Sequence, residues 1–290
     1  MSQILIQSQS LCEANQGLQK QQQKQKASSP ILSVRDLSFS YRQVPTLQKI
    51  SFDLNSGHFV CVLGANGAGK TTLFKLLLKQ LKAQEGRILY DGTEISELST
   101  RTLAQKVAYI PQIHQLQFSY SVFDMVLMGT SGSFSYLSGP TQEAKLRTQK
   151  ALERLNLSNY ADRMYDRLSG GEQQLVLIAR ALAQQTPILV MDEPCSALDY
   201  GNQMRVLRII RELADEGYTI LLSTHHPEHA RLFAHQVMVI HEKKLFAHGP
   251  TASTLSADLL QEIYHIEIRE DQLLSNGETI FVVEQKSVLN

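Results

Sequence analysis

The feature that most constrains how this chain folds is a glycine-rich segment, GANGAGKT, from Gly64 to Thr71. It matches the pattern GxxxxGK[ST] at every position, and it lies between a continuous apolar run, Phe59 to Leu63, and a stretch with helical spacing, Thr71 to Leu81. Glycines allow backbone N–H groups to curl around phosphate oxygens, and the positive end of the following helix faces the same anion. The segment therefore predicts a strand, a phosphate-binding loop and a helix.

This loop predicts ATP and Mg2+ as ligands. Lys70 would reach the β- and γ-phosphates, and the Thr71 hydroxyl can ligate Mg2+. The alternative is a glycine turn that caps an ordinary helix. The candidate nucleotide-binding residues here are Gly64, Asn66, Gly67, Ala68, Gly69, Lys70, Thr71 and Thr72.

Two further apolar strands are predicted later in the chain, from Ile188 to Met191 and from Thr219 to Ser223. Each follows a helical stretch, Gln173 to Ala183 and Gln203 to Ala214. Strands that alternate with helices favour a parallel sheet with crossover connections. The predicted fold class is therefore α/β.

The first of these strands ends in two carboxylates, Asp192 and Glu193. The carboxyl ends of parallel strands are where open α/β sheets bind ligands. We expect Asp192 to hold Mg2+ through water and Glu193 to polarise the attacking water as a general base. The alternative is a solvated strand end without a ligand. The presence of a phosphate loop in the same chain favours the functional interpretation.

A second glycine-containing segment, Leu168-Ser169-Gly170-Gly171-Glu172, precedes an apolar helix. Ser169 and Glu172 have the spacing of a capping box. LSGGE between a phosphate loop and an acidic strand end resembles the signature of the ATP-binding-cassette family, and the match extends over about Leu32 to Gly249. In that family two cassettes pair head to tail. The resemblance therefore implies a second copy of the chain as partner, with Ser169, Gly170 and Gly171 binding the nucleotide of that copy.

The resemblance also assigns roles to residues outside these motifs. Tyr41 is similar to the aromatic residue that stacks on adenine, although a packed, half-exposed tyrosine is the alternative. Gln112 resembles the glutamine that contacts Mg2+ and the attacking water. His225 resembles the switch histidine that bonds the γ-phosphate. The implied catalytic residues are Glu193, His225, Gln112 and Lys70, and the implied metal ligands are Thr71, Gln112 and Asp192.

The segment around these residues contains two further features. Ser196 to Asp199 resembles the loop that crosses the dimer interface, and Cys195 is expected to be a small filler. His225 and His229 could be misread as a metal-binding pair. No glutamate stands beside His225 as in HExxH, and we expect Pro227 to disturb the helix that would align the two rings.

The resemblance implies a P-loop ATPase with a RecA-like parallel-sheet core, an antiparallel β subdomain and a helical subdomain. The expected cassette covers residues 31–252, with the helical subdomain at about 113–168, interrupted by the Gly/Ser-rich stretch Gly129 to Gly139. A Gln/Lys-rich leader, residues 1–30, is expected to be disordered. Residues 253–290 are expected to form a helix and a hairpin that turns at Asn276-Gly277.

Composition narrows the functional class. Lysine plus arginine equals aspartate plus glutamate, at 28 each, which argues against a nucleic-acid partner bound through a broad basic face. The three cysteines form no CxxC pair, so neither a zinc site nor a disulfide framework is predicted. We find no apolar stretch of the roughly 20 residues that a membrane span requires.

A cassette without a span resembles a stand-alone importer subunit. Ser121 to Gly129 is similar to the V-x-D-x-V-x-x-G stretch of importers for iron chelates, haem, cobalamin and molybdate, although Thr130 stands where many of them have arginine. The implied partners are polytopic permease subunits and, indirectly, an external binding protein. The implied location is the cytoplasmic face of the membrane. The alternatives are a soluble ATPase of iron–sulfur assembly or another remodelling role, and a cassette that binds ATP without turnover.

Overall fold

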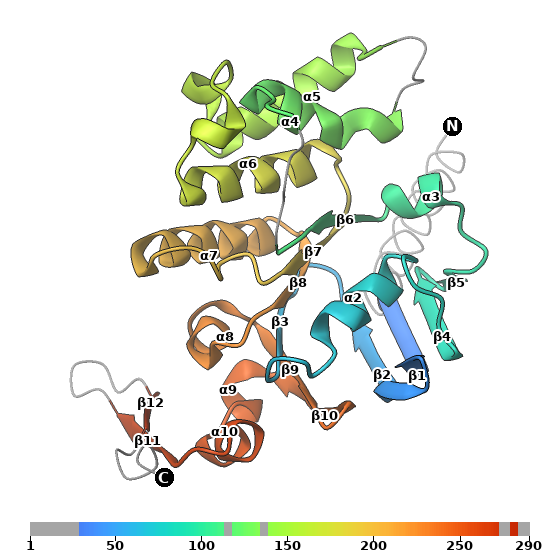
Figure 1. The fold of residues 1–290 in the computed structure, drawn as a ribbon, viewed down its shortest axis with the longest axis vertical. Helices are drawn as coiled ribbons and strands as arrows, with labels where there is room; N and C mark the ends of the chain where they lie inside the picture. Colours follow the sequence, from blue (N-terminus) through green and yellow to red (C-terminus); the bar gives the residue numbers. More distant parts are fainter. Residues whose placement is uncertain (1–28, 113–117, 134–138, 273–278, 284–290) are drawn as a thin grey trace, which may run out of the picture.

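The computed structural model describes residues 29–112, 118–133, 139–272 and 279–283 (Figure 1). The expected disorder of the leader and the expected turn at Asn276-Gly277 lie outside these residues, apart from the last two leader positions. The strands are β1 (Leu32–Tyr41), β2 (Val44–Leu54), β3 (Phe59–Leu63), β4 (Glu85–Tyr90), β5 (Thr93–Glu94), β6 (Val107–Ile110), β7 (Ile188–Asp192), β8 (Thr219–Ser223), β9 (Gln236–His241), β10 (Lys244–Pro250), β11 (Ile268–Gln272) and β12 (Thr279–Val283). The helices are α2 (Lys70–Leu77), α3 (Thr100–Ala104), α4 (Val122–Leu127), α5 (Gln142–Arg154), α6 (Gly170–Ala183), α7 (Tyr200–Asp215), α8 (Pro227–Phe233), α9 (Thr251–Thr254) and α10 (Ala257–Tyr264), with 3-10 turns η1 (Met128–Ser133), η2 (Ser158–Tyr160) and η3 (Tyr165–Arg167).

A six-stranded sheet in the order β10-β9-β3-β8-β7-β6 runs through the molecule. Neighbouring strands from β9 to β6 are parallel, and β10 pairs antiparallel with β9. The connections from β7 to β8 and from β8 to β9 contain α7 and α8, as parallel pairing requires. The predicted α/β fold with a parallel core is confirmed.

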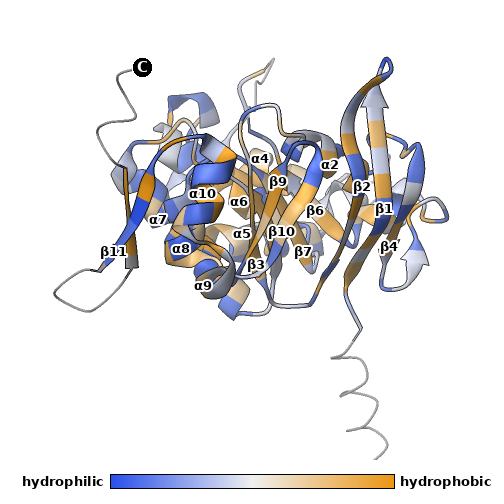
Figure 2. Cartoon of the chain, turned by 90° about the horizontal axis from the view of Figure 1, so that it is seen from below, coloured by the Kyte–Doolittle hydropathy of each residue, from blue (hydrophilic) through white to orange (hydrophobic). Residues whose placement is uncertain are grey.

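The strands of this sheet are buried on both faces, which explains their continuous apolar sequences. Along β3, Phe59, Cys61 and Leu63 enter one hydrophobic core, with α6, α7 and α8. Val60 and Val62 point the other way, into the core that also contains α2 and the second sheet. Figure 2 shows the hydrophobic strands enclosed by elements with hydrophilic outer surfaces.

The second sheet is antiparallel, in the order β2-β1-β4-β5, and it corresponds to the expected antiparallel β subdomain. The segments Ile31 to Val34 and Leu37 to Tyr41 each have strand character in the sequence, which predicts two strands, but the structure has the single strand β1. Asp36 adopts a positive φ of 48°, and the register with β2 shifts between Val34 and Leu37. A bulge thus interrupts the alternation of side chains without ending the strand.

A helical layer lies above the central sheet in Figure 1, made of α4, η1 and α5 packed against α6. The helices expected at about 113–168 lie in this layer, which also includes α6. The expected interruption at Gly129 is helical at its start, because η1 extends from Met128 to Ser133. Thr130 is buried, and its hydroxyl donates a hydrogen bond to the Leu127 carbonyl. No described helix is long and apolar enough to cross a membrane.

Gly129 allows η1 to approach α6 closely. A Cβ atom added at Gly129 would lie 2.0 Å from the backbone oxygen of Arg180. We predict that Gly129→Ala lowers the free energy of unfolding by about 1–3 kcal/mol or more, because backbone must move to relieve the overlap. Urea denaturation measures this change. Gly132→Ala is the matched control, since a Cβ atom there has nothing within 4 Å, and an equal loss in the two variants would contradict the prediction.

Candidate active site

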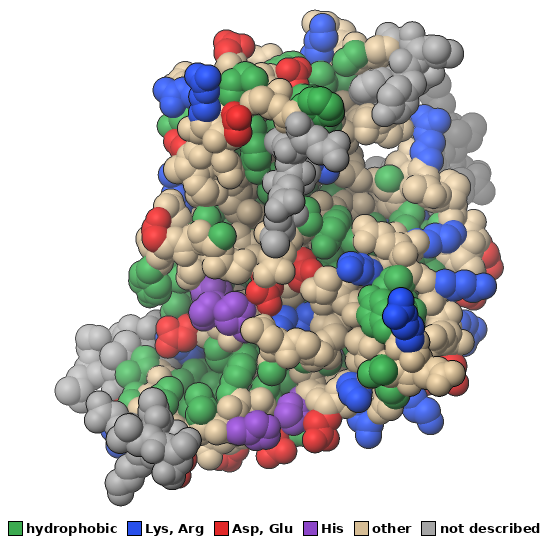
Figure 3. Space-filling model, viewed as in Figure 1, with side chains coloured by type: hydrophobic (Ala, Val, Ile, Leu, Met, Phe, Trp, Pro, Cys, Tyr) green, Lys and Arg blue, Asp and Glu red, His purple; other side chains and the backbone are tan. Residues whose placement is uncertain are grey.

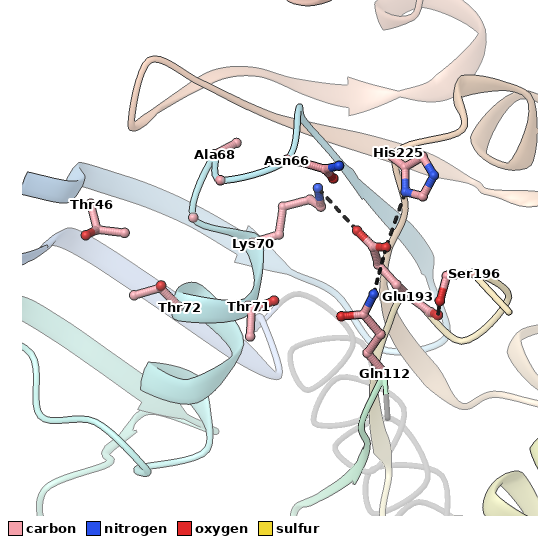
Figure 4. A pocket seen from close by; sticks show the side chains of 12 residues that line it. Thr46, Asn66, Ala68, Lys70, Thr71, Thr72, Gln112, Glu193, Ser196 and His225 are labelled. Atoms are coloured by element: carbon pink, nitrogen blue, oxygen red, sulfur yellow. Dashed lines mark hydrogen bonds and ion pairs between the residues drawn. The ribbon is translucent and has the colours of Figure 1, made fainter. Parts of the chain in front are cut away.

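A cavity of about 510 Å3 opens where the phosphate loop, the end of β7 and the segment after β8 meet. Figure 4 shows Glu193 near its centre, with Lys70, Gln112 and His225 directed toward it. The order of the strands explains this meeting, because β8 lies between β3 and β7 and their carboxyl ends share one edge. The lining residues are Thr46, Asn66, Gly67, Ala68, Gly69, Lys70, Thr71, Thr72, Gln112, Glu193, Ser196 and His225.

The phosphate loop leads directly into α2. Gly69 is the N-cap of this helix, with a φ of 106°, and a Cβ atom there would lie 2.7 Å from the Leu47 side chain. A glycine is therefore required at this position. Lys70 is buried, and its Nζ donates hydrogen bonds to the carbonyl oxygens of Gly64 (2.8 Å) and Ala65 (3.3 Å). The loop thus positions one lysine charge at the start of a helix.

Glu193 is surrounded by groups that complement a negative charge. Its carboxylate lies 3.5 Å from Lys70 Nζ, and Gln112 Nε2 donates a hydrogen bond to it over 3.3 Å. His225 Nδ1 lies 3.2 Å from Oε2, a close approach without the alignment of a hydrogen bond. The side chain of Glu193 is only 13% exposed, so these contacts act with little screening by solvent.

The backbone of Glu193 adopts an unusual conformation, with a φ of 45°. Left-handed backbone at a non-glycine residue costs on the order of 1–3 kcal/mol and persists where surrounding contacts hold it. Ser223 Oγ accepts a hydrogen bond from Glu193 N (2.9 Å), and Ser196 donates from N and Oγ to the Glu193 carbonyl (3.2 and 3.0 Å). These bonds direct the carboxylate into the cavity.

Asp192 lies behind Glu193 rather than in the cavity lining. It is buried, and its Oδ1 accepts a hydrogen bond of 2.5 Å from Ser223 Oγ. Ser223 therefore joins both members of the acidic pair, a contact that the sequence analysis missed. The available signal was a serine that closes the apolar run of β8. Burial, together with the Asp192 charge, raises the pKa of Tyr109 to about 12.

Several predicted site residues lie outside this cavity lining. Tyr41 is 43% exposed at the end of β1, and its ring packs edge-on against Phe39, with centroids 4.9 Å apart. Ser169, Gly170 and Gly171 begin α6, where Ser169 and Glu172 form the predicted capping box. Hydrogen bonds from the Ser169 backbone and hydroxyl lower the pKa of Glu172. The cavity also contains Thr46 of β2, an isolated threonine for which the sequence offers no signal.

The region around His225 contains three neighbouring histidines, and Figure 3 shows histidine side chains gathered near α8. The prediction that Pro227 prevents one helix from aligning His225 with His229 is confirmed, because α8 begins at Pro227, where a missing N–H has no cost. His225 precedes this helix, whereas His229 is buried within it. The His229 ring contacts Thr224 and Gln203 (3.1 and 3.3 Å). In the described part of the chain, no three His, Cys, Asp or Glu side chains are grouped to hold a metal ion.

Burial raises the pKa values of two further groups near the site. Burial raises the pKa of the Cys195 thiol to about 12, in agreement with the predicted filler role. Tyr264 of α10 donates a hydrogen bond to the His225 carbonyl (3.1 Å), and burial, with the Glu193 charge, raises its pKa to about 12. The helix after the last core strand thus contacts the His225 segment.

Comparison with known proteins identifies similar sequences. A family model described as "ABC transporter" matches residues 47–196. An uncharacterised ABC transporter ATP-binding protein of Haemophilus influenzae is 38% identical over 81% of this chain and 89% of its own. The molybdate import ATP-binding protein MolC of the same organism is 36% identical over 83% of this chain and 90% of its own.

A solved structure gives a similar result at the level of the fold. It is described as a metal-chelate type ABC transporter in an inward-facing conformation. It is 33% identical to this chain, with a TM-score of 0.80, and the match covers 90% of this chain and 100% of that one.

The buried ring of His229 predicts a dependence of stability on pH. Burial lowers its pKa from 6.5 to about 4, so the unfolded chain takes up this proton at a higher pH than the folded chain. The free energy of unfolding should therefore fall as the pH falls from about 6.5 to about 4. Urea titrations at a series of pH values measure the slope.

Burial also lowers the pKa values of His226, His235 and His248, so all four histidines contribute to this slope. The comparison between variants isolates His229. His229→Gln should flatten the pH dependence relative to the wild type, because glutamine does not titrate in this range. An unaltered slope in His229→Gln would contradict the assignment.

Proposed function

Because the chain belongs to the ABC transporter family of ATPases, we propose that it is the ATP-hydrolysing subunit of a membrane importer, with Glu193 as the general base. The observation that carries this proposal is the placement of Glu193. A carboxylate that contacts Lys70, Gln112 and His225 stands in the cavity that the phosphate loop lines. Such a group can accept a proton from a water that attacks the terminal phosphate.

Each of the surrounding residues has a role in this reaction. Lys70 now contacts both loop carbonyls and Glu193, and it would exchange some of these contacts for β- and γ-phosphate oxygens. His225 would bond the γ-phosphate, and Gln112 would orient the attacking water. Transition-state charge on the phosphate is then met by Lys70, by the loop N–H groups and by the N-terminus of α2.

The oxygen atoms at this edge of the sheet fit Mg2+. The Thr71 hydroxyl and the Gln112 carboxamide belong to cavity residues, and hard cations prefer such oxygen ligands. Asp192 lies one layer deeper, hydrogen-bonded to Ser223, which suits a contact through water. Bound Mg2+ would supply neutralisation of phosphate charge.

A second copy of the chain would complete the site. Ser169, Gly170 and Gly171 are predicted nucleotide-binding residues, yet they lie outside the cavity lining. Their place at the N-terminus of a 14-residue helix suits an anion from another molecule. Tyr41, exposed at the end of β1, is available to stack on adenine.

The importer role and the cargo rest on the relatives. One of them is named for molybdate import, and the similar structure is of the metal-chelate type. We therefore assign a metal chelate or an oxyanion such as molybdate as the cargo class. The chain would lie at the cytoplasmic face of the membrane, bound to permease subunits. An external binding protein would deliver the cargo to those permease subunits. The fold, the site and these relatives add no support for a soluble iron–sulfur assembly ATPase.

We predict that Glu193→Gln retains ATP binding and lowers steady-state ATP hydrolysis by about 10²- to 10⁴-fold, because the amide cannot accept the proton. Phosphate release and nucleotide-binding titrations measure the two properties separately. Glu262→Gln, an exposed change of the same chemistry, should match the wild type. Hydrolysis near the wild-type rate in Glu193→Gln would remove this residue from the base role.

We predict that Ser169→Arg leaves nucleotide binding to the isolated chain unchanged and prevents ATP-dependent pairing of two copies, because a long cation would occupy the position of the shared phosphate. Size-exclusion chromatography in a Glu193→Gln background detects the pair. Ser256→Arg is the matched control, since both serines are N-caps whose loss costs about 1 kcal/mol. A wild-type ATPase rate in Ser169→Arg would contradict the shared site.

A further inference from the structure

The region of His225, His226 and His229 contains a chain of hydrogen bonds that the proposed reaction does not use. It begins at the 195–198 loop, which follows Glu193, and ends at the segment that holds His225. Gln203 Nε2, at the start of α7, donates to the carbonyl oxygens of Cys195 (3.2 Å) and Leu198 (2.9 Å). The Gln203 amide therefore binds the loop by two bonds at once.

The same side chain continues toward the other loop. Gln203 Oε1 lies 3.3 Å from His229 Nε2, and His229 Nδ1 lies 3.1 Å from Thr224 Oγ1. Thr224 Oγ1 in turn accepts a hydrogen bond from His226 N (3.1 Å). Thr224 and His229 are 3% and 4% exposed, so water competes little for these bonds.

The direction of each bond follows from the chemistry of the groups. The Gln203 nitrogen faces two carbonyls, so its oxygen faces His229 and must accept a hydrogen bond from Nε2–H. A neutral imidazole then has Nδ1 as an acceptor, which the Thr224 hydroxyl can satisfy as donor while it accepts from His226 N. Gln203, His229 and Thr224 therefore all have hydrogen-bond partners when neutral His229 carries its proton on Nε2. Burial favours neutral His229 by lowering its pKa to about 4.

Gln203, His229 and Thr224 come from α7, α8 and the end of β8, and together they join two backbone segments that both border the cavity. Ser196 of the first segment and His225 of the second line it. A movement of one loop would therefore strain bonds that hold the other.

We propose that Gln203, His229 and Thr224 are positioning residues that couple the 195–198 loop to His225, so that docking of a second copy on this loop sets the position of His225 toward the nucleotide. This inference rests on the proposed function, in which two copies pair, and on the resemblance of Ser196 to Asp199, which overlaps this loop, to the loop that crosses the interface between two cassettes. In this proposal His229 is neither a metal ligand nor only a packed side chain, but the link between Gln203 and Thr224.

The test uses near-isosteric changes at the two ends of the connection in the full-length chain. Gln203→Met and Thr224→Val should each lower kcat for ATP hydrolysis by about tenfold, which is about 1.4 kcal/mol of transition-state energy, with KM for ATP within twofold of the wild type. The double variant should be no slower than the slower single variant, because both changes break one connection.

A matched control separates coupling from structural support. Gln184 also donates to two carbonyls, those of Ala104 and Val107, at a site away from the cavity. Gln184→Met should cost similar thermal stability and leave kcat unchanged. His229→Gln, which keeps one donor and one acceptor, should restore most of the rate that His229→Leu loses.

The outcomes distinguish this inference from the proposed function. Equal losses of kcat in Gln203→Met and Gln184→Met, or independent and additive effects of Gln203→Met and Thr224→Val, would overturn the coupling. A wild-type rate in Gln203→Met, with Glu193→Gln inactive, would overturn the coupling alone. A wild-type chain that hydrolyses no ATP would overturn the proposed function and the coupling with it.

Discussion

The order of strands in the central sheet is the constraint on which the rest of the structure depends. The neighbours β3, β8 and β7 run in the same direction, so their carboxyl ends lie side by side. The phosphate loop follows β3, Glu193 follows β7, and His225 comes two residues after β8. Residues separated by more than 150 positions in the chain therefore meet in one cavity, and no loop needs to fold back to bring them there. The helices that the parallel pairing requires then cover the sheet and provide the α2 N-terminus for phosphate.

The strained backbone of Glu193 coincides with a pair of buried charges. Lys70 and Glu193 are both shielded from solvent, and a buried ion without a partner is costly. With its left-handed conformation, Glu193 has its carboxylate 3.5 Å from Lys70 Nζ and 3.2 Å from His225 Nδ1, so the lysine charge has a partner. Ser223 holds this geometry from the neighbouring strand, since its single hydroxyl serves the Glu193 amide and the Asp192 carboxylate. An entering phosphate would compete with Glu193 for Lys70, which releases the carboxylate toward water.

The parts of the fold and site that the sequence predicted are those with local signals. The glycines before Lys70, the acidic end of an apolar run and the capping box at Ser169 each lie within a few residues of one another. The site residues that were missed are different, because their partners come from other elements. Ser223 is a short polar side chain at the end of an apolar strand, and Thr46 is one in a strand of mixed polarity. Nothing nearby in sequence says which loop either residue faces. Likewise, Tyr264 reaches the His225 carbonyl from a helix 39 positions away. The single β1 strand was read as two because a bulge at Asp36 breaks the alternation that sequence reasoning relies on.

The arrangement of the site supports the proposal that two copies act as a pair. The cavity in one chain offers the phosphate loop and the proposed general base, but the helix N-terminus at Ser169 lies outside its lining. An anion that carries several charges needs donors on more than one side to be desolvated. In the proposed reaction, a lone chain would leave one side of the phosphates open to water, and Glu193 would have no fixed nucleophile to activate. Closure by a second copy would add the missing donors and exclude bulk water in one step. The 195–198 loop borders both the cavity and the proposed interface. Through its hydrogen bonds to Gln203, a movement of this loop on closure would be transmitted to the His225 segment beside the cavity.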